Sequence, residues 1–319
     1  MRKIRTYNEV DHGTGSQLLE QVLEQRARLQ ERLASVGRVV AVASGKGGVG
    51  KSAVTANLAG AMAAQGLRVG VLDADLNGPS LARMLQVRGR PLEDRAHGVV
   101  PPTSPHGVKV FSMELLQGQE NAPLRWKEPE TDTFLWQSSM ETTALREFLA
   151  DVEWGELDFL LVDVPPGTDK IRRLLELVPD PPVALIVSTP AEISRAVVLR
   201  SIGLIREAEV PAAGIVANMT EYLCPDCGHR GTLFRGDGIR RLAEESGLNV
   251  WARIPFDPSL GEETDAGAPP AGRDPEGLIG RAFAGLVDRL REAPDGSERG
   301  PGGEGDPGAD ESPRTEEPS

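Results

Sequence analysis

Short apolar runs alternate with helical segments along most of the chain. From residue 37 onward there are seven such runs, each four or five residues long, and the segments between them have helical periodicity. Strands separated by helices form βαβ units, so the pattern predicts an α/β protein with a mostly parallel, doubly wound sheet flanked by helices. The predicted strands are 39–43, 69–72, 108–111, 159–162, 183–187, 214–217 and 250–254, and the predicted helices begin near Lys51, Met140, Lys170, Ile193, Gly238 and Pro275.

The segments outside these units divide the chain into three parts. Residues 1–36 are predicted to be a flexible start followed by an amphipathic helix over 17–34, and residues 37–291 form the α/β domain. Residues 292–319 contain Gly, Pro, Ser and acidic residues with almost no apolar side chain, which predicts a disordered acidic tail. Two stretches inside the domain, 84–106 and 117–137, have little periodicity and are predicted to contain long loops.

Charge and composition argue against two kinds of partner, nucleic acids and membranes. The formal net charge is −13, and the tail contributes nine acidic residues against two arginines. A nucleic-acid face needs clustered basic residues, so we expect no nucleic-acid partner. No stretch has the roughly 18 apolar residues of a membrane helix, and no signal peptide is recognisable, which predicts a cytoplasmic protein without a membrane partner.

A glycine-rich loop follows the first predicted strand. It fits the pattern G-x-x-x-x-G-K-[ST], with a strand before it and a helix after it. Glycines allow successive N–H groups to point at phosphate oxygens, Lys51 neutralises the β- and γ-phosphates, and the Ser52 hydroxyl can bind Mg²⁺. The alternative is a glycine-rich turn that matches by chance. The predicted ATP-binding loop consists of Gly45, Lys46, Gly47, Gly48, Val49, Gly50, Lys51 and Ser52.

Carboxylates follow two later strands. Asp73 and Asp75 come after 69–72, and if the segment stays extended their side chains point the same way, where they could orient water or hold the Mg²⁺ shell. The alternative is that both only cap turns. Asp163 follows 159–162 as in a Walker B strand and is predicted to hold Mg²⁺ through water, beside a stiff turn at 165–168.

The chain has two cysteines, Cys224 and Cys227, spaced C-x-x-C after a predicted strand. The pair could be a redox disulfide, a structural zinc site or an iron–sulfur ligand set. Zinc and cubane clusters normally take four ligands, so two copies of the chain in a twofold dimer would complete the set. His229 is a candidate third zinc ligand, although a loop position without a metal role is the simpler interpretation.

Several motifs together resemble one family. The lysine at position 46 is typical of the deviant Walker A ATPases, which include MinD and ParA and have the SIMIBI-type P-loop architecture. The resemblance narrows to the Mrp-type iron–sulfur cluster carriers through residues 45–52, 73–80, 163–168, 214–228 and 254–258.

That resemblance implies an ATP-hydrolysing homodimer that holds a bridging [4Fe-4S] cluster between its Cys224 and Cys227 pairs. It implies transfer of the cluster to apo iron–sulfur proteins, in contact with cluster-assembly proteins. Lys46 would reach the nucleotide of the opposing subunit, and Asp73 would act on the attacking water. The resemblance further assigns Asp75 to the metal and switch region and places Asn218 and Pro255 near adenine. The catalytic set is then Lys46, Lys51 and Asp73.

Two departures from the family pattern bear on the predicted ATP hydrolysis, and the shortened turn keeps an ATP-binding scaffold open. Ala53 replaces the usual Thr after Ser52, and the usual Pro-Pro-Gly-Thr-Gly-Asp is shortened to 165–169, with Thr168 directly before Asp169, which predicts slow hydrolysis. One alternative is a positioning ATPase like MinD or ParA, and another is an ATP-binding scaffold stapled by zinc.

Overall fold

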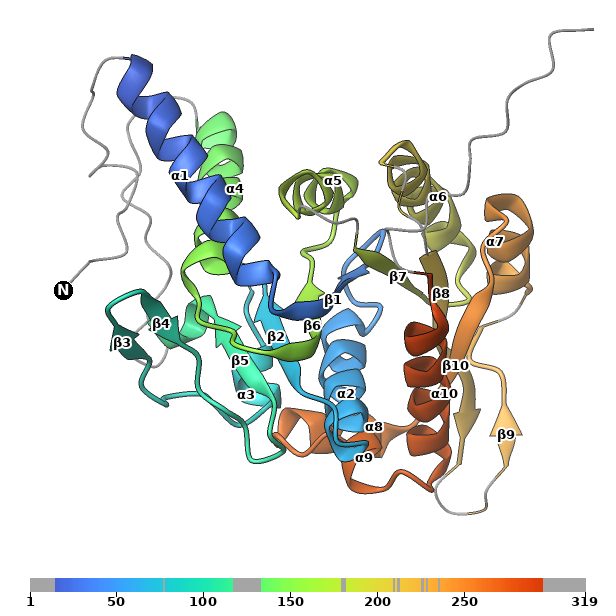
Figure 1. The fold of residues 1–319 in the computed structure, drawn as a ribbon. Helices are drawn as coiled ribbons and strands as arrows, with labels where there is room; N and C mark the ends of the chain where they lie inside the picture. The colour runs from blue at the N-terminus through green and yellow to red at the C-terminus, as the bar shows by residue number, and fades with distance from the viewer. Residues whose placement is uncertain are drawn as a thin grey trace, which may run out of the picture.

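The computed structural model describes residues 15–76, 78–116, 133–178, 182–208, 210, 213–224, 227, 229–234 and 236–294. Within this part of the chain, one sheet runs through the middle of the molecule in the order β10-β8-β7-β1-β6-β2-β5 (Figure 1). Every neighbouring pair on this path is parallel. The strands are β1 (Val36–Ala43), β2 (Val69–Asp73), β5 (Lys109–Ser112), β6 (Leu157–Asp163), β7 (Val183–Ser188), β8 (Ala213–Leu223) and β10 (Val250–Phe256).

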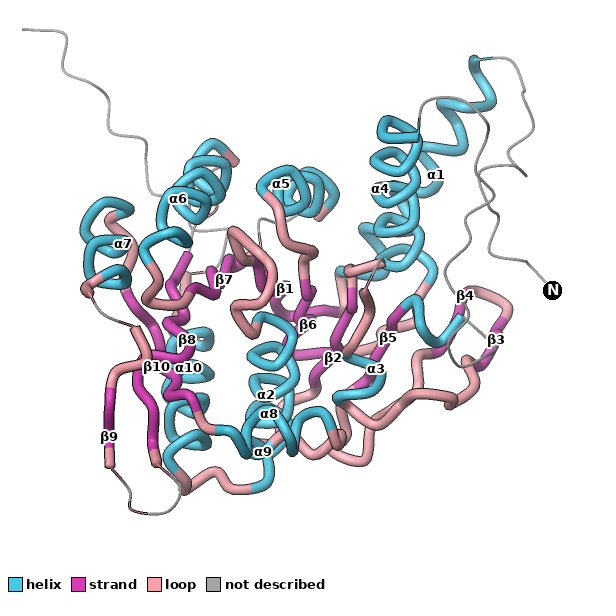
Figure 2. The backbone as a smooth tube through the Cα atoms, turned by 180° about the vertical axis from the view of Figure 1, so that it is seen from behind, coloured by secondary structure: helices cyan, strands magenta, loops and turns pink. Residues whose placement is uncertain are grey.

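Helices cover both faces of this sheet. Helices α2 and α10 lie on one side, and α4, α5, α6 and α7 lie on the other (Figure 2). The described helices are α1 (Gly15–Leu33), α2 (Lys51–Ala64), α3 (Leu81–Met84), α4 (Thr133–Asp151), α5 (Thr168–Leu177), α6 (Glu192–Glu207), α7 (Gly238–Ser246), α8 (Pro258–Asp265), α9 (Pro270–Arg273) and α10 (Leu278–Glu292), with a 3₁₀ turn η2 (Met113–Leu116).

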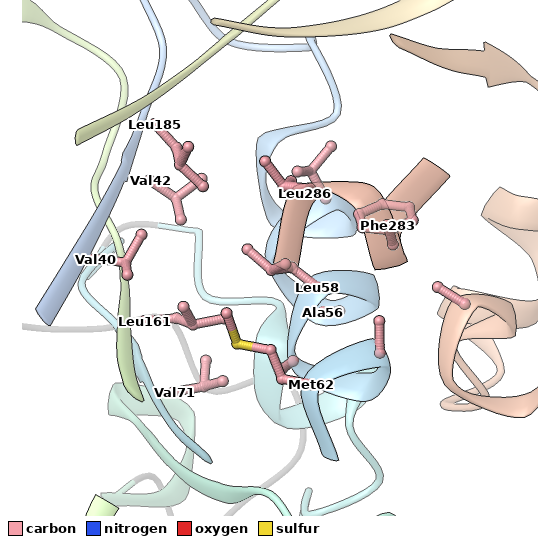
Figure 3. Close-up of a cluster of buried hydrophobic side chains, with 14 of the residues drawn as sticks. Val40, Val42, Ala56, Leu58, Met62, Val71, Leu161, Leu185, Phe283 and Leu286 are labelled. Carbon is pink, nitrogen blue, oxygen red and sulfur yellow. The ribbon is translucent and has the colours of Figure 1, made fainter. Parts of the chain in front are cut away.

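The side chains of β1 alternate between the two layers. Val40 and Val42 pack with α2 and α10, where Leu58 and Phe283 are fully buried (Figure 3). Val39, Ala41 and Ala43 face the opposite layer, with buried side chains of α4, α5 and α6. A strand buried on both faces is apolar throughout, which is why the short apolar runs predicted strands in the first place.

All seven predicted strands are confirmed, with ends that differ by a few residues. The largest difference is in β8, which continues six residues beyond the predicted end at 217 and pairs there with the antiparallel β9 (Arg230–Gly231). The predicted loop at 84–106 contains a small hairpin of β3 (Glu93–Arg95) and β4 (Gly98–Val100). The loop predicted to reach residue 137 is wrong from Thr133 onward, where α4 begins, and 117–132 lie outside the described residues.

The predicted N-terminal helix is confirmed as α1, and it packs beside α4 (Figure 1). Leu29 and Leu33 are buried at this contact, and Arg32 Nε donates to the carbonyl of Ala150 at 3.3 Å. Residues 1–14 and 295–319, which include most of the predicted acidic tail, lie outside the described residues. None of the helices described has the length and apolarity that crossing a bilayer requires.

Candidate active site and cysteine hairpin

The carboxyl ends of three central strands meet at one place. In the register, Val42 of β1 lies opposite Asp163 of β6, and Asp73 of β2 lies on the other side of the same Asp163. The loop at 45–50 leaves β1 at this edge and leads into α2. Ligands of open α/β sheets bind at this edge, so the fold brings the predicted phosphate loop and both predicted acidic strand ends together.

The phosphate loop touches its neighbours through glycines. A Cβ atom on Gly45 would lie 2.8 Å from the backbone N of Val198, so this glycine allows α6 to approach. Gly48 and Gly50 have φ of +76° and +81°, which favour glycine. No side chain caps the first turn of α2, which leaves that helix end suited to a phosphate.

Asp163 is the buried centre of this site. Lys51 Nζ lies 2.7 Å from its Oδ2, and the hydroxyl of Ser52 donates to the same oxygen at 2.7 Å. The hydroxyl of Thr55 donates to Oδ1 at 2.9 Å. Asp163 is fully buried and Lys51 is 7% exposed, so three donors from one helix surround a carboxylate that water does not reach.

Sequence reasoning missed Thr55. Helix α2 is almost entirely apolar and buried, and Thr55 and Asn57 are its fully buried polar side chains. A buried hydroxyl needs a hydrogen-bond partner, so a polar residue one turn after the phosphate loop was the available signal.

Asp73 organises the loop that follows it. Its Oδ2 accepts hydrogen bonds from the backbone N–H groups of Ser80 (2.9 Å) and Leu81 (3.1 Å) and from the hydroxyl of Ser112 (3.2 Å). Burial, together with the neighbouring charge of Asp163, raises the pKa of Asp73 to about 7, while these N–H groups and Lys51 act in the opposite direction. A carboxyl with such a pKa can hold or release a proton near neutrality.

The expected arrangement of Asp75 is wrong. Strand β2 ends at Asp73, and the N–H of Asp75 turns back to Asp73 Oδ1 at 3.2 Å, so the two side chains do not leave one extended segment. The N–H of Gly78 donates to Asp75 Oδ1 at 3.0 Å. Both aspartates accept backbone N–H groups of the turns that follow them, and their roles toward water and metal stay predictions.

Lys46 and the turn that follows Asp163 are the two other loop features of the site. Lys46 is partly exposed, and its carbonyl accepts the Ser44 hydroxyl at 3.0 Å. In the shortened turn after Asp163, Gly167 has φ +124° and α5 begins directly at Thr168. The contact of Lys46 with an opposing subunit and the slow hydrolysis stay predictions.

Asn218 lies against the phosphate loop. Its Nδ2 donates to the carbonyl of Val49 at 2.9 Å, and a Cβ on Gly50 would lie 2.4 Å from that same nitrogen. Asn218 is 3% exposed, and its Oδ1 has no hydrogen-bond partner among the described residues. Pro255 follows Ile254, which pairs with Asn218 in the sheet. The sheet thus brings both residues predicted near adenine together, beside the phosphate loop.

The two cysteines lie in the turn of a hairpin. Strand β8 ends at Leu223, β9 returns beside it at the periphery of the molecule, and the N–H of Cys224 donates to the carbonyl of His229 at 2.9 Å (Figure 2). Cys224 is half-buried, Cys227 is exposed, and no disulfide joins them. Across the described residues, no three His, Cys, Asp or Glu side chains lie together as a metal-binding group, and the metal role of His229 stays a prediction.

Comparison with known proteins places this chain in a family of iron-transfer P-loop NTPases. The family model described as NUBPL iron-transfer P-loop NTPase matches residues 35–291. The iron–sulfur cluster carrier protein of Saccharolobus solfataricus is 36% identical over 272 residues, which are 85% of this chain and 88% of that protein.

Solved structures agree on the fold. A nucleotide-binding protein from Archaeoglobus fulgidus, solved in complex with ADP, is 33% identical with a TM-score of 0.63, over 86% of this chain and 97% of that one. The MinD cell division protein of Aquifex aeolicus is 23% identical with a TM-score of 0.53, over 80% of this chain and 97% of that one, and supports the fold alone.

Proposed function

The chain belongs to the NUBPL iron-transfer P-loop NTPases, and on this basis we propose that it is an ATPase that carries iron–sulfur clusters and transfers them to apoproteins. The reaction at the phosphate loop is the hydrolysis of ATP by water to ADP and phosphate. The cargo is a [4Fe-4S] cluster held by cysteine thiolates.

The residues around Asp163 fit ATP and Mg²⁺. The uncapped start of α2 can receive phosphate oxygens, and the buried Oδ1 of Asn218 is an acceptor that an exocyclic amine of a nucleobase could satisfy. Lys51, Ser52 and Asp163 are the cation, hydroxyl and carboxylate that a phosphate-bound Mg²⁺ requires. The metal, when bound, neutralises charge that develops on the phosphates.

Nucleotide binding must rearrange the contacts of Asp163. Lys51 would leave the carboxylate for the β- and γ-phosphates, and the Ser52 hydroxyl would turn toward the metal. Asp163 would then be available to a water of the metal shell. Asp73 would accept the proton of the attacking water once its bonds to Ser80 and Leu81 loosen. The raised pKa of Asp73 favours this proton transfer.

The cysteine hairpin fits a cluster shared by two chains. Cys224 and Cys227 supply two thiolates at an accessible turn, and a cubane cluster takes four. A twofold homodimer that places two such turns face to face supplies the full set. A cluster held at a surface by ligands from two chains can also leave when the chains move apart, as transfer to an apoprotein requires.

One observation carries the proposal: a single strand joins the two sites. Strand β8 bonds to the phosphate loop through Asn218 and reaches the hairpin turn at Cys224, six residues later. Between them Met219 has φ +58°, and the pairing with β10 shifts register. Such an irregularity bends the strand and re-aims the residues beyond it, so the direction in which β8 leaves Asn218 sets where the cysteines lie.

Anaerobic reconstitution tests this function. The protein with iron and sulfide should show the brown thiolate-to-iron absorption, and Cys224→Ala and Cys227→Ala should lose it while ATP hydrolysis persists. Lys51→Ala should keep the colour and lose hydrolysis. The wild-type protein should pass its cluster to an apo [4Fe-4S] acceptor. Stoichiometric zinc without iron uptake, or iron uptake that survives loss of both cysteines, would contradict the proposal.

A further inference from the structure

We propose that Thr55 is a positioning residue that holds Asp163 in place for Mg²⁺ when ATP binds, a role that rests on the ATPase activity proposed above. Thr55 belongs to α2, three residues after Ser52 and four after Lys51, so all three side chains lie on one side of the helix. Its side chain is fully buried.

The donors to Asp163 are unequally divided between its two oxygens. Lys51 and Ser52 both contact Oδ2, whereas in the described part of the chain Thr55 is the hydrogen-bond donor to Oδ1. The carboxylate is therefore held at two separate points. Removing the donors of one oxygen leaves the other point intact.

Asp163 would lose only one of these two contact points when nucleotide and Mg²⁺ bind. Lys51 and Ser52 are the two residues that bind phosphate and metal, so both must leave Oδ2. Thr55 has no such second task, because its hydroxyl lies one turn deeper and is enclosed. The bond from Thr55 to Oδ1 would then keep the carboxylate in its present orientation and leave Oδ2 available to the metal shell.

The surroundings of Asp163 make this bond necessary. Asp73 lies opposite Asp163 in the register of β2 and β6, and two neighbouring carboxylates repel each other. Once Lys51 has moved to the phosphates, the Asp163 carboxylate would turn away from Asp73 unless a donor held it. The single hydroxyl proton of Thr55 has two acceptors within reach, Asp163 Oδ1 at 2.9 Å and the carbonyl of Lys51 at 3.0 Å, and the charged carboxylate is the stronger acceptor of the two.

The test compares Mg²⁺-dependent with metal-free nucleotide binding. Thr55→Val keeps the shape and removes the hydroxyl, and Thr55→Ser restores it. Ser201→Ala is the matched control, because Ser201 is a buried helical hydroxyl of α6 whose described bond is to the carbonyl of Val197. A fluorescent ATP analogue is titrated with Mg²⁺, and separately in EDTA.

We expect Thr55→Val to raise the Mg²⁺ concentration for half-maximal binding about tenfold, as expected for one hydrogen bond to a charged group. Binding in EDTA should change less than about twofold, because the phosphate contacts of the loop remain. Thr55→Ser and Ser201→Ala should follow the wild-type protein. If Thr55→Val does not fold, Thr55→Ala carries the same expectation, and circular dichroism establishes the fold of each variant.

A folded Thr55→Val protein with unchanged Mg²⁺ dependence would overturn the role of Thr55, as would an equal loss in EDTA. Failure of Thr55→Ser to restore the Mg²⁺ dependence would also overturn it. A wild-type protein that binds the analogue without any effect of Mg²⁺ would instead overturn the proposed ATPase, and this inference with it.

Discussion

At the scale of single residues, Gly45 and Gly47 belong to the same loop but meet different surroundings. A Cβ on Gly45 would collide with the backbone of α6 at Val198, whereas a Cβ on Gly47 would meet nothing within 4 Å. We expect Gly45→Ala to lower the free energy of unfolding by about 1–3 kcal/mol, because the loop or the helix must move.

Gly47→Ala is the control for that prediction. It should leave the free energy of unfolding within about 0.5 kcal/mol of the wild type, or raise it slightly by restricting the unfolded chain. Urea denaturation of the nucleotide-free proteins measures both. Equal losses for the two alanine variants would contradict the close approach of α6 to Gly45.

Asp163 and Lys51 form a buried ion pair whose loss is costly when only one partner is removed. Asp163→Asn should destabilise the nucleotide-free protein by about 3 kcal/mol, because it leaves a buried ammonium without its counter-charge. Lys51→Met combined with Asp163→Asn should recover much of that loss, as measured by urea denaturation. Strictly additive losses would indicate that the two charges do not interact.

At the scale of elements, Glu147 makes the stability of α4 depend on pH. Burial and the neighbouring Asp151 raise the pKa of Glu147 to about 7. Its pKa in the unfolded chain is about 4.3, so between these values the folded state binds a proton that the unfolded state does not, and stability falls as pH rises.

Replacing this carboxyl should remove that part of the pH dependence. Glu147→Gln should be more stable than the wild type by about 1 kcal/mol at pH 8, after allowing for partial solvent screening, and should show little difference at pH 4.5. Thermal unfolding at both pH values measures the effect, with the exposed Glu262→Gln as control. A constant difference between pH 4.5 and pH 8 would contradict the raised pKa.

The elements also show what sequence could predict. The central strands were predictable because both faces are buried, which produces continuous apolar runs such as 183–187. The β3–β4 hairpin was missed because residues 93–95 are three exposed polar residues without alternation. The short helices α3, α8 and α9 were missed because four to eight residues hold too little periodicity to be recognised.

The parts of the candidate site that belong to short sequence motifs were predictable. The loop at 45–52 and Asp163 were located by residue type and spacing, and the sheet brings them together. The direction of Asp75 was wrong because it depended on where β2 ends, and Thr55 was missed because its partner is 108 residues away. The end of β2 and the partner of Thr55 are both set by the folded structure, and the spacing of motifs along the sequence does not reveal them.

At the scale of the whole molecule, one chain holds all the residues of the proposed phosphate site but only half of the ligands of the proposed cluster site. The phosphate loop, Asp73 and Asp163 meet within a single sheet edge. The thiols of Cys224 and Cys227 lie apart from that edge on an accessible hairpin, without further ligands among the described residues. The proposed carrier activity therefore requires two copies of the chain, joined where their hairpins meet.

Iron stoichiometry combined with molecular mass tests this requirement most directly. The anaerobically reconstituted protein, analysed for iron and sulfide while its mass is measured by light scattering, should contain about four iron and four sulfide ions per two chains. Its mass should be that of a dimer, and Cys227→Ala should lose both the iron and the cluster-dependent dimer. A full complement of iron bound by a single chain would contradict the account.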